Sequence, residues 1–387
     1  MFYFLYLTFF KEGTIFSVLR IFRFITVRAF ISLFIAFIIS LIIGPYIIDY
    51  LRKYKISQMI RKDYGYPESH QLKLGTPTMG GLIILISTII SILLCANLKN
   101  LFILWGLIVL VGFGIIGFID DYLKLTKKNP EGLKARYKLL LQIYVSLLIG
   151  IIIYVYKVYV AKLWDIGFNP SELDYKNFVS TIYTTYISIP FFKNLLINLN
   201  YFYIVFVVFV ITGSSNAVNL TDGLDGLAAG TVALTAVSFA VLSYLAGNWK
   251  IASYLNILFI QGAAEMTVYC AAIIGAMLGF LWFNSYPASV FMGDTGSLAI
   301  GAAIGYTAIV IKKELLLIFA GGIFVIEALS VMLQVFSFKL YKKRIFLMAP
   351  IHHHYEKMGL KEPKIILRFW IVSIILTLIT LATVKFQ

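Results

Sequence analysis

Ten long apolar stretches constrain the fold of this chain more than any other feature. They lie at approximately 27–49, 80–96, 101–119, 139–160, 199–213, 227–246, 266–283, 298–311, 315–337 and 367–385. Stretches of this kind cross about 30 Å of hydrocarbon as helices. Only 13% of the 387 residues are charged, whereas a soluble domain has about 25%. The sequence therefore predicts an all-α polytopic membrane protein with about ten transmembrane helices, formed by residues 1–387 as a single integral-membrane domain.

The distribution of lysine and arginine predicts the orientation in the membrane. Segments 50–79, 120–138 and 338–366 contain 19 of the 33 basic residues, and ten spans place all three on one side. Basic residues of short loops are retained in the cytoplasm, so this side is expected to be cytoplasmic and both termini outside. Four basic residues near the amino terminus favour the opposite orientation, but the loop count outweighs them. The amino-terminal segment has no small-residue cleavage site, which predicts that it is retained.

Several patterns that indicate other functions are absent or misplaced. Cys95 and Cys270 fall in or beside apolar stretches and form no CxxC pair. The sequence GFGIIG at 112–117 has the spacing of a dinucleotide loop but lies inside an apolar stretch, where small residues favour close helix packing. The net charge of +15 follows mainly from cytoplasmic loops beside anionic headgroups, with room for a polyanionic substrate. No nucleic acid partner is expected.

Two adjacent aspartates, Asp120 and Asp121, close the third apolar stretch in the sequence GFIDDYLK. Ionisable groups at membrane depth are costly enough to be functional candidates by default. The simpler alternative is that they cap the span in the headgroup zone, where Lys124 and two further lysines neutralise them. The motifs that follow favour the functional interpretation.

A second polar motif is NAVNLTDGLDGLAAG, residues 216–230. Four of its polar residues recur at intervals of three: Asn216, Asn219, Asp222 and Asp225. On a helical turn they would share one face, while the glycines leave backbone amides open to a ligand. An EF-hand is excluded because its alternating acids and terminal glutamate are missing.

Two further motifs complete the polar set. FMGDTGSLAIG at 291–301 places Asp294 between two glycines, shortly after Asn284. MAPIHHHYEKMG at 348–359 contains three of the four histidines. Adjacent imidazoles point in different directions, so this is a poor zinc site, but it is suitable for binding phosphates through hydrogen bonds and charge.

The predicted topology brings these motifs, together with GTPTMGG at 75–81, to one cytoplasmic face. A transporter would more commonly bury its charged sites at the middle of the bilayer, so chemistry at the membrane surface is favoured. Clustered aspartates suit Mg²⁺, which keeps water and substrate phosphates among its ligands. Phosphoryl transfer needs such a metal and basic side chains. We therefore expect transfer of a phosphosugar onto a lipid phosphate.

These motifs strongly resemble those of the phospho-N-acetylmuramoyl-pentapeptide transferase family, within the polyprenyl-phosphate N-acetylhexosamine-1-phosphate transferase superfamily. The resemblance rests on GTPTMGG, GFIDDYLK, NLTDGLDGLA, FMGDTGSLA and APIHHHYE, and covers about residues 20–385 in order and spacing. The triple histidine followed by Glu356 resembles the motif that is specific to the muramoyl-pentapeptide branch of this superfamily. Ten spans with both termini outside is also that family's architecture. One departure is Leu360, where the family more often has tryptophan.

The resemblance implies a bacterial cytoplasmic membrane enzyme that converts UDP-MurNAc-pentapeptide and undecaprenyl phosphate to lipid I and UMP, in peptidoglycan synthesis. It also implies a homodimer, contact with membrane lipids, and Mg²⁺ as cofactor with Asp294 as its ligand. Asp120 and Asp121 would form the catalytic pair. Asp120 would deprotonate the lipid phosphate, whose second pKa is about 6. In an alternative two-step route an aspartate attacks the β-phosphate and forms a covalent intermediate.

The resemblance further implies the residues that bind the nucleotide and the phosphates. Phe291 would stack on uracil, whose edge would be recognised by Lys73, Asp225 and the backbone near Gly223. Ribose or pyrophosphate would contact Asn219, Asp222, Thr78 and Asn284. Charge on the phosphates would be stabilised by Lys124, His353 and His354, and His352 is counted among the substrate-binding residues. The prenyl chain would lie in an apolar groove between spans.

Three other functions are distinguishable by experiment. A sister enzyme would transfer N-acetylglucosamine-1-phosphate and would consume a different UDP-sugar. A transporter or channel would keep its transport without a lipid acceptor. A scaffold without catalytic activity would tolerate loss of all the aspartates.

Overall fold

The computed structural model describes residues 1–10, 15–54, 75–126, 132–165, 185–190, 192 and 195–386. In the first half of the chain the helices are α1 (Phe2–Phe9), the 3₁₀ segment η1 (Ile15–Arg23), α2 (Ile25–Lys53), α3 (Gly81–Cys95), α4 (Leu101–Thr126) and α5 (Ala135–Asp165). A two-stranded antiparallel sheet follows, formed by β1 (Tyr186–Ser188) and β2 (Leu196–Asn198).

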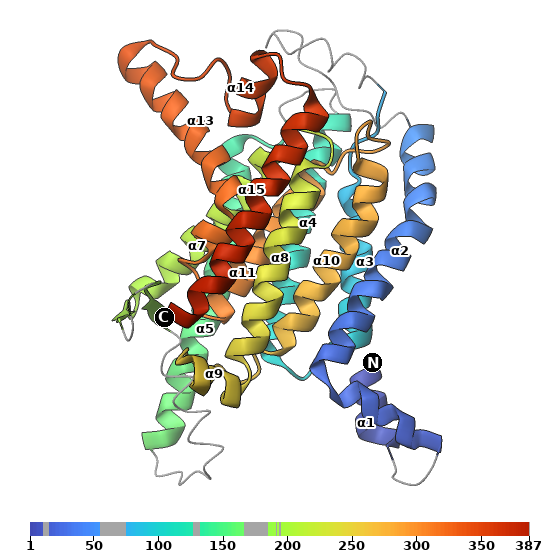
Figure 1. Ribbon diagram of the computed structural model, residues 1–387, viewed down its shortest axis with the longest axis vertical. Coiled ribbons are helices and arrows are strands. Elements are labelled where there is room, and N and C mark those ends of the chain that lie inside the picture. The colour runs from blue at the N-terminus through green and yellow to red at the C-terminus, as the bar shows by residue number, and fades with distance from the viewer. Residues whose placement is uncertain are drawn as a thin grey trace.

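From Phe202 onward, every regular element of the described residues is a helix. These elements are α7 (Phe202–Thr221), α8 (Leu227–Ala246), α9 (Trp249–Leu255), α10 (Glu265–Asn284), α11 (Gly293–Val310), α12 (Leu317–Ala320), α13 (Gly322–Tyr341), α14 (Ile351–Lys357), α15 (Glu362–Ala382) and the 3₁₀ segment η5 (Thr383–Phe386). The long helices run side by side as one bundle (Figure 1).

The helices confirm the predicted class, a helical polytopic membrane protein. Each of the ten apolar stretches falls on a helix. Within the described residues, eight helices are long and apolar enough to cross a membrane: α2, α4, α5, α7, α8, α10, α13 and α15. The other two stretches fall on α3, which has 15 residues, and α11, which has 18. The total of ten spans, their orientation and the single domain stay predictions.

Helix α11 is less apolar than its neighbours because protein, and not lipid, surrounds it. Every residue from Thr295 to Val310 is buried, in contact with α3, α4, α7 and α8. Glycines make this close packing possible. A Cβ atom at Gly117 of α4 would lie 2.2 Å from the carbonyl oxygen of Asp294, and one at Gly81 of α3 would lie 2.1 Å from the Gly296 nitrogen. The packing role predicted for the glycines of GFGIIG is confirmed here.

Two glycine pairs with GxxxG spacing, Gly275 with Gly279 and Gly301 with Gly305, allow close helix packing in the same way. A Cβ atom at Gly275 of α10 would lie 2.0 Å from the Leu33 carbonyl oxygen of α2, and one at Gly279 would lie 2.4 Å from Ser40. Gly301 and Gly305 of α11 press against α7 at Ser214. Small residues therefore set the distance between the central helices.

The two ends of the bundle differ in what they carry. Helices α2 and α10 are parallel, since Arg28 pairs with Glu265 where both begin and Gly44 meets Phe283 near the end of α10. Both chain ends lie in the lower half of Figure 1, whereas α14 and the outward-leaning end of α13 lie at the top. The predicted site motifs belong to the upper end.

Candidate active site

Three aspartate carboxylates meet where α4 ends and α11 begins. Asp120 and Asp121 lie near the end of α4 and Asp294 in the first turn of α11. One oxygen of each carboxylate lies within 4.8 Å of the others, although Asp294 is far from the pair in the chain. Asp120 and Asp121 are buried, and Asp294 is 13% exposed at its side chain. The close approach of α11 at Gly117 creates this cluster.

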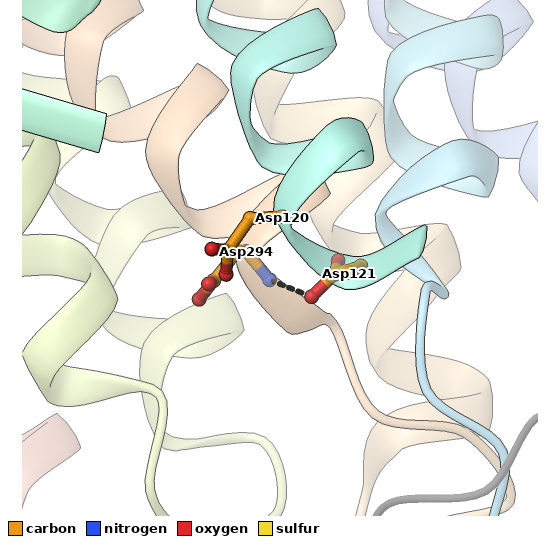
Figure 2. A group of neighbouring side chains, drawn as sticks. All are labelled: Asp120, Asp121 and Asp294. Atoms are coloured by element: carbon orange, nitrogen blue, oxygen red, sulfur yellow. Dashed lines mark hydrogen bonds between the residues drawn. The ribbon is translucent and has the colours of Figure 1, made fainter. Parts of the chain in front are cut away.

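Asp121 uses its carboxylate to hold the start of α11. Its Oδ2 accepts hydrogen bonds from the Thr295 amide at 2.9 Å and the Thr295 hydroxyl at 2.7 Å. Its Oδ1 accepts the Asp294 amide at 3.3 Å, the bond drawn in Figure 2. The first amides of a helix have no partner within the helix, and a negative charge there is stabilising. Asp121 therefore fixes the backbone of Asp294 to α4.

Two lysine ammonium groups lie between the other two carboxylates. Lys124 Nζ is 2.6 Å from Asp120 Oδ2 and 2.7 Å from Asp294 Oδ2. Lys138, from α5, is 2.8 Å from Asp294 and 3.7 Å from Asp120. In the sequence, Lys138 is one of the six basic residues of segment 120–138 and was not expected in the site. Its position one turn after Lys134 in the sequence GLKARYKLL, at the start of a span, is the signal that would have singled it out.

The spacing of Asn216, Asn219, Asp222 and Asp225 predicted that they share one helical face. The structure shows that they do not. The Asn219 amide donates to Asp294 Oδ1 at 2.6 Å and to Ser297 Oγ at 2.8 Å. The Asn216 amide donates instead to Gln142 of α5 at 2.7 Å. Helix α7 ends at Thr221, so the residues beyond it follow a loop and not the helical face.

Asp222, the residue that follows α7, lies beside the carboxylate cluster. Burial raises the pKa of Asp222 well above its ordinary value, and the nearby carboxylates of Asp294 and Asp121 raise this pKa further. A bound cation would oppose that effect by favouring the charged form. The segment after α7 therefore contributes a fourth acid next to the predicted catalytic residues.

The loop 222–226 is held by side chains from distant helices. Glu362 of α15 accepts the Asp225 amide at 2.8 Å, and the Asn284 side chain accepts the Gly226 amide at 2.9 Å. Asp225 Oδ2 in turn accepts the Ala288 amide at 3.0 Å. Asn284 is buried and also donates to the Val290 carbonyl, so it supports the protein here, and its contact with ribose or pyrophosphate stays a prediction.

The GTPTMGG and FMGDTGSLA motifs pair with each other along their backbones. The Phe291 amide donates to the Pro77 carbonyl and the Gly80 amide to the Phe291 carbonyl, both at 2.8 Å. Thr78 consequently lies against Gly293. A Cβ atom built on Gly293 would be 3.0 Å from the hydroxyl oxygen of Thr78. Phe291 is half-buried. Lys73 lies outside the described residues.

The three histidines point in different directions, as expected for adjacent imidazoles. His352 is fully buried, with Nδ1 3.1 Å from a carboxylate oxygen of Glu327. His353 Nδ1 lies 2.6 Å from Glu356 Oε2. His354 Nδ1 accepts the Leu347 amide at 3.1 Å. Each of the three imidazoles therefore has a different neighbour.

The cluster of carboxylates suits a hard divalent cation. Mg²⁺ takes oxygen ligands and uses only one or two protein carboxylates together with substrate phosphates. Both oxygens of Asp121 are engaged by α11, which leaves Asp120 and Asp294 as the residues best placed to hold a metal. The residues present therefore fit a metal site.

Comparisons with known proteins identify close relatives. Residues 102–312 match the family described as Glycosyl transferase family 4, and residues 73–85 match the phospho-N-acetylmuramoyl-pentapeptide-transferase signature 1. The chain is 49% identical over 372 residues to the phospho-N-acetylmuramoyl-pentapeptide-transferase of Thermodesulfovibrio yellowstonii, covering 96% of each chain. It is 50% identical over 370 residues to the protein of that name from Rickettsia felis, covering 95% of this chain and 96% of the relative.

Proposed function

The chain belongs to the phospho-N-acetylmuramoyl-pentapeptide transferase family, and from this premise we propose that it transfers phospho-MurNAc-pentapeptide from UDP-MurNAc-pentapeptide to undecaprenyl phosphate. The products are lipid I, for peptidoglycan synthesis, and UMP. The observation that carries the proposal is the meeting of Asp120, Asp121 and Asp294 with two lysines at one end of a membrane-spanning bundle. Such a site is accessible to one soluble and one lipid substrate.

Asp120 is the best candidate for the general base. The amides and hydroxyl at the start of α11 occupy both oxygens of Asp121. Asp120 Oδ1 accepts the Leu133 amide, and its Oδ2 lies beside the ammonium groups of Lys124 and Lys138. Asp120 would take the proton of the lipid phosphate, which then attacks the β-phosphate as UMP leaves. In the two-step alternative Asp120 itself attacks the β-phosphorus and expels UMP, and the lipid phosphate then displaces the Asp120 carboxylate from the covalent phosphosugar intermediate. Lys124 and Lys138 stabilise the negative charge that develops on the phosphate oxygens.

We propose Mg²⁺ as the cofactor, held by Asp294 with Asp120 beside it. When bound, Mg²⁺ supplies charge neutralisation that lets an anionic nucleophile approach phosphorus. Asn219 supports this arrangement because its amide orients the Asp294 carboxylate. Lys124 and Lys138, which contact Asp294, would lie next to the substrate phosphates.

The nucleotide is proposed to bind between loop 222–226 and the paired motifs at 77–81 and 291–293. Phe291 would stack on uracil, and Asp225 with the Gly223 backbone would recognise its edge, together with Lys73. Support comes from the contacts that place both segments next to the carboxylate cluster. An aromatic face with a few polar groups is a common arrangement for binding a small ligand.

The site end is proposed to face the cytoplasm of a bacterial inner membrane. The basic segments 50–79, 120–138 and 338–366 follow α2, α4 and α13, and these helices all end at the site end. Basic loops are retained in the cytoplasm, where a UDP-linked substrate is available. A homodimer is also proposed, from the family resemblance alone.

Release of UMP by the purified protein in detergent tests the function. Undecaprenyl phosphate and Mg²⁺ are supplied with either UDP-MurNAc-pentapeptide or UDP-GlcNAc, and each reaction is repeated with EDTA. We expect Mg²⁺-dependent UMP only from the pentapeptide nucleotide. UMP from UDP-GlcNAc alone would indicate the sister transferase, and UMP from neither would reject both.

A further inference from the structure

A fully buried carboxylate on α13 has no role in the site as described so far. Half of the residues of α13 have exposed side chains. The buried residues are Gly322, Ile323, Phe324, Glu327, Ser330 and Ser337. Glu327 is 0% exposed. An ionisable group inside a membrane helix is costly and is retained where it pairs with another group or serves function.

The partner of Glu327 is His352 of the triple-histidine motif. Its Nδ1 lies 3.1 Å from Glu327 Oε2, and neither side chain has solvent exposure above 1%. The contact lacks hydrogen-bond geometry, so the carboxylate acts on the imidazole through its charge and through close packing. Because both side chains are buried against each other, Glu327 restricts how far the His352 ring can turn.

The other side of the His352 ring presses on the loop that carries Asp222 and Asp225. A Cβ atom at Gly223 would lie 2.2 Å from His352 Nε2 and 2.8 Å from Cε1. The back of this loop is held by Glu362 and Asn284 through the Asp225 and Gly226 amides. His352 supports the front of the loop, so a turn of its imidazole would move Gly223 relative to the carboxylate cluster.

We propose that Glu327 is a positioning residue for nucleotide binding. This role rests on the proposed function, in which loop 222–226 binds the UDP moiety. Glu327 holds the His352 imidazole against Gly223 and so keeps the loop in its binding position. Glu327 touches neither substrate. Its removal should therefore weaken binding of the uridine nucleotide more than it slows the transfer step.

The test measures UMP release for Glu327→Gln and Glu327→Leu while each substrate is varied separately. Glu327→Leu is expected to raise KM for UDP-MurNAc-pentapeptide about tenfold, with kcat within about threefold and KM for undecaprenyl phosphate unchanged. Glu327→Gln, which keeps a side chain of the same size against the imidazole, should recover part of the loss. Ser330→Ala is the matched control, because Ser330 is buried one turn away and its hydroxyl bonds only to the Glu327 carbonyl.

The double variant Glu327→Leu with His352→Leu separates positioning from packing. If Glu327 acts through His352, the double variant should show the same KM as His352→Leu alone. Losses that add, an equal rise in both KM values, or a fall in kcat alone would overturn the inference. Should Glu327→Leu not fold, Glu327→Gln and its double variant with His352→Leu decide by the same criteria. Failure of the proposed function is a separate result, seen as absence of UMP release by the unaltered chain.

Discussion

The two ends of α10 carry buried charges of opposite character. At its start, Arg28 of α2 makes two contacts with Glu265, at 2.5 and 2.8 Å, and donates to the Cys95 carbonyl at 3.2 Å. One cation meets one anion, with side-chain exposures of 1% and 9%. A pair with this fork geometry balances its charge within the protein.

Near the far end of α10 the charges are not matched in this way. Three carboxylates face two ammonium groups, and Lys124 is 35% exposed at its side chain. The carboxylate cluster therefore has negative charge in excess and access to solvent, whereas the Arg28–Glu265 pair has neither. The comparison indicates that buried charge in this protein is structural where it is paired one to one, and chemical where the pairing is incomplete.

Loss of Asp294 should give the largest effect at the incomplete site. We expect Asp294→Asn to lower UMP release at least about 1,000-fold, equivalent to about 4 kcal/mol of barrier, because the metal ligand and the partner of both lysines disappear. Thermal unfolding in detergent should change little. Asp49→Asn, an exposed residue of α2, is the control. Retention of more than a tenth of the rate would contradict the assignment.

Breaking the matched pair should instead damage stability and spare the chemistry. Arg28→Ala leaves Glu265 charged and buried, which costs about 3–5 kcal/mol, so the midpoint of thermal unfolding should fall clearly. The double variant Arg28→Met with Glu265→Leu should recover most of the loss. Turnover per folded molecule should stay unchanged in both. If the double variant is as unstable as Arg28→Ala, the one-to-one pairing is not what stabilises this end.

Gly117 and Gly114 of α4 allow the packing next to the carboxylate cluster to be compared with the packing one turn away from it. Gly117→Ala places a methyl group 2.2 Å from the Asp294 backbone, and overpacking of this kind costs about 1–3 kcal/mol. Because α11 must shift, UMP release should fall about 10- to 100-fold. In Gly114→Ala, the atoms nearest to the new methyl group belong to the Leu85 side chain, at 2.7 Å. This side chain can move, so the loss of activity should be smaller. Equal activity losses in the two variants would show that the α4–α11 distance does not control the site.

A hydrogen bond between α2 and α3 should have the smallest effect. The Ser91 hydroxyl donates to the Ser32 carbonyl at 2.6 Å, and bonds of this kind within membrane bundles contribute about 0.6 kcal/mol. Ser91→Ala should therefore lower the unfolding midpoint slightly and leave UMP release unchanged. A loss of stability as large as that of Arg28→Ala would place a polar network, and not the ion pair, at the centre of this end of the bundle.

Several parts of the site were predictable because they depend on residue type. Asp120, Asp121 and Asp294 stand out as carboxylates beside apolar stretches, and the structure brings them together. Lys138 was not singled out, since its position at the start of a span does not tell which acids it meets until α5 packs beside α4. The shared face predicted for Asn216 and Asp225 failed because α7 ends at Thr221, and a regular spacing carries no information about where a helix stops.

The sequence by itself determined the helical membrane class, the apolar stretches and the acidic and histidine motifs, because burial in lipid requires long apolar helices and makes each charge within them conspicuous. Only the tertiary structure decided what each charge does. Asp120 and Asp121 are neighbours of the same type, yet Asp121 holds the first amides of α11 while Asp120 faces lysines. Glu327 and Glu265 are both buried acids, yet one lies beside a histidine and the other pairs with an arginine. The partner of a buried charge is set by which helices meet, and that depends on packing between residues far apart in the chain.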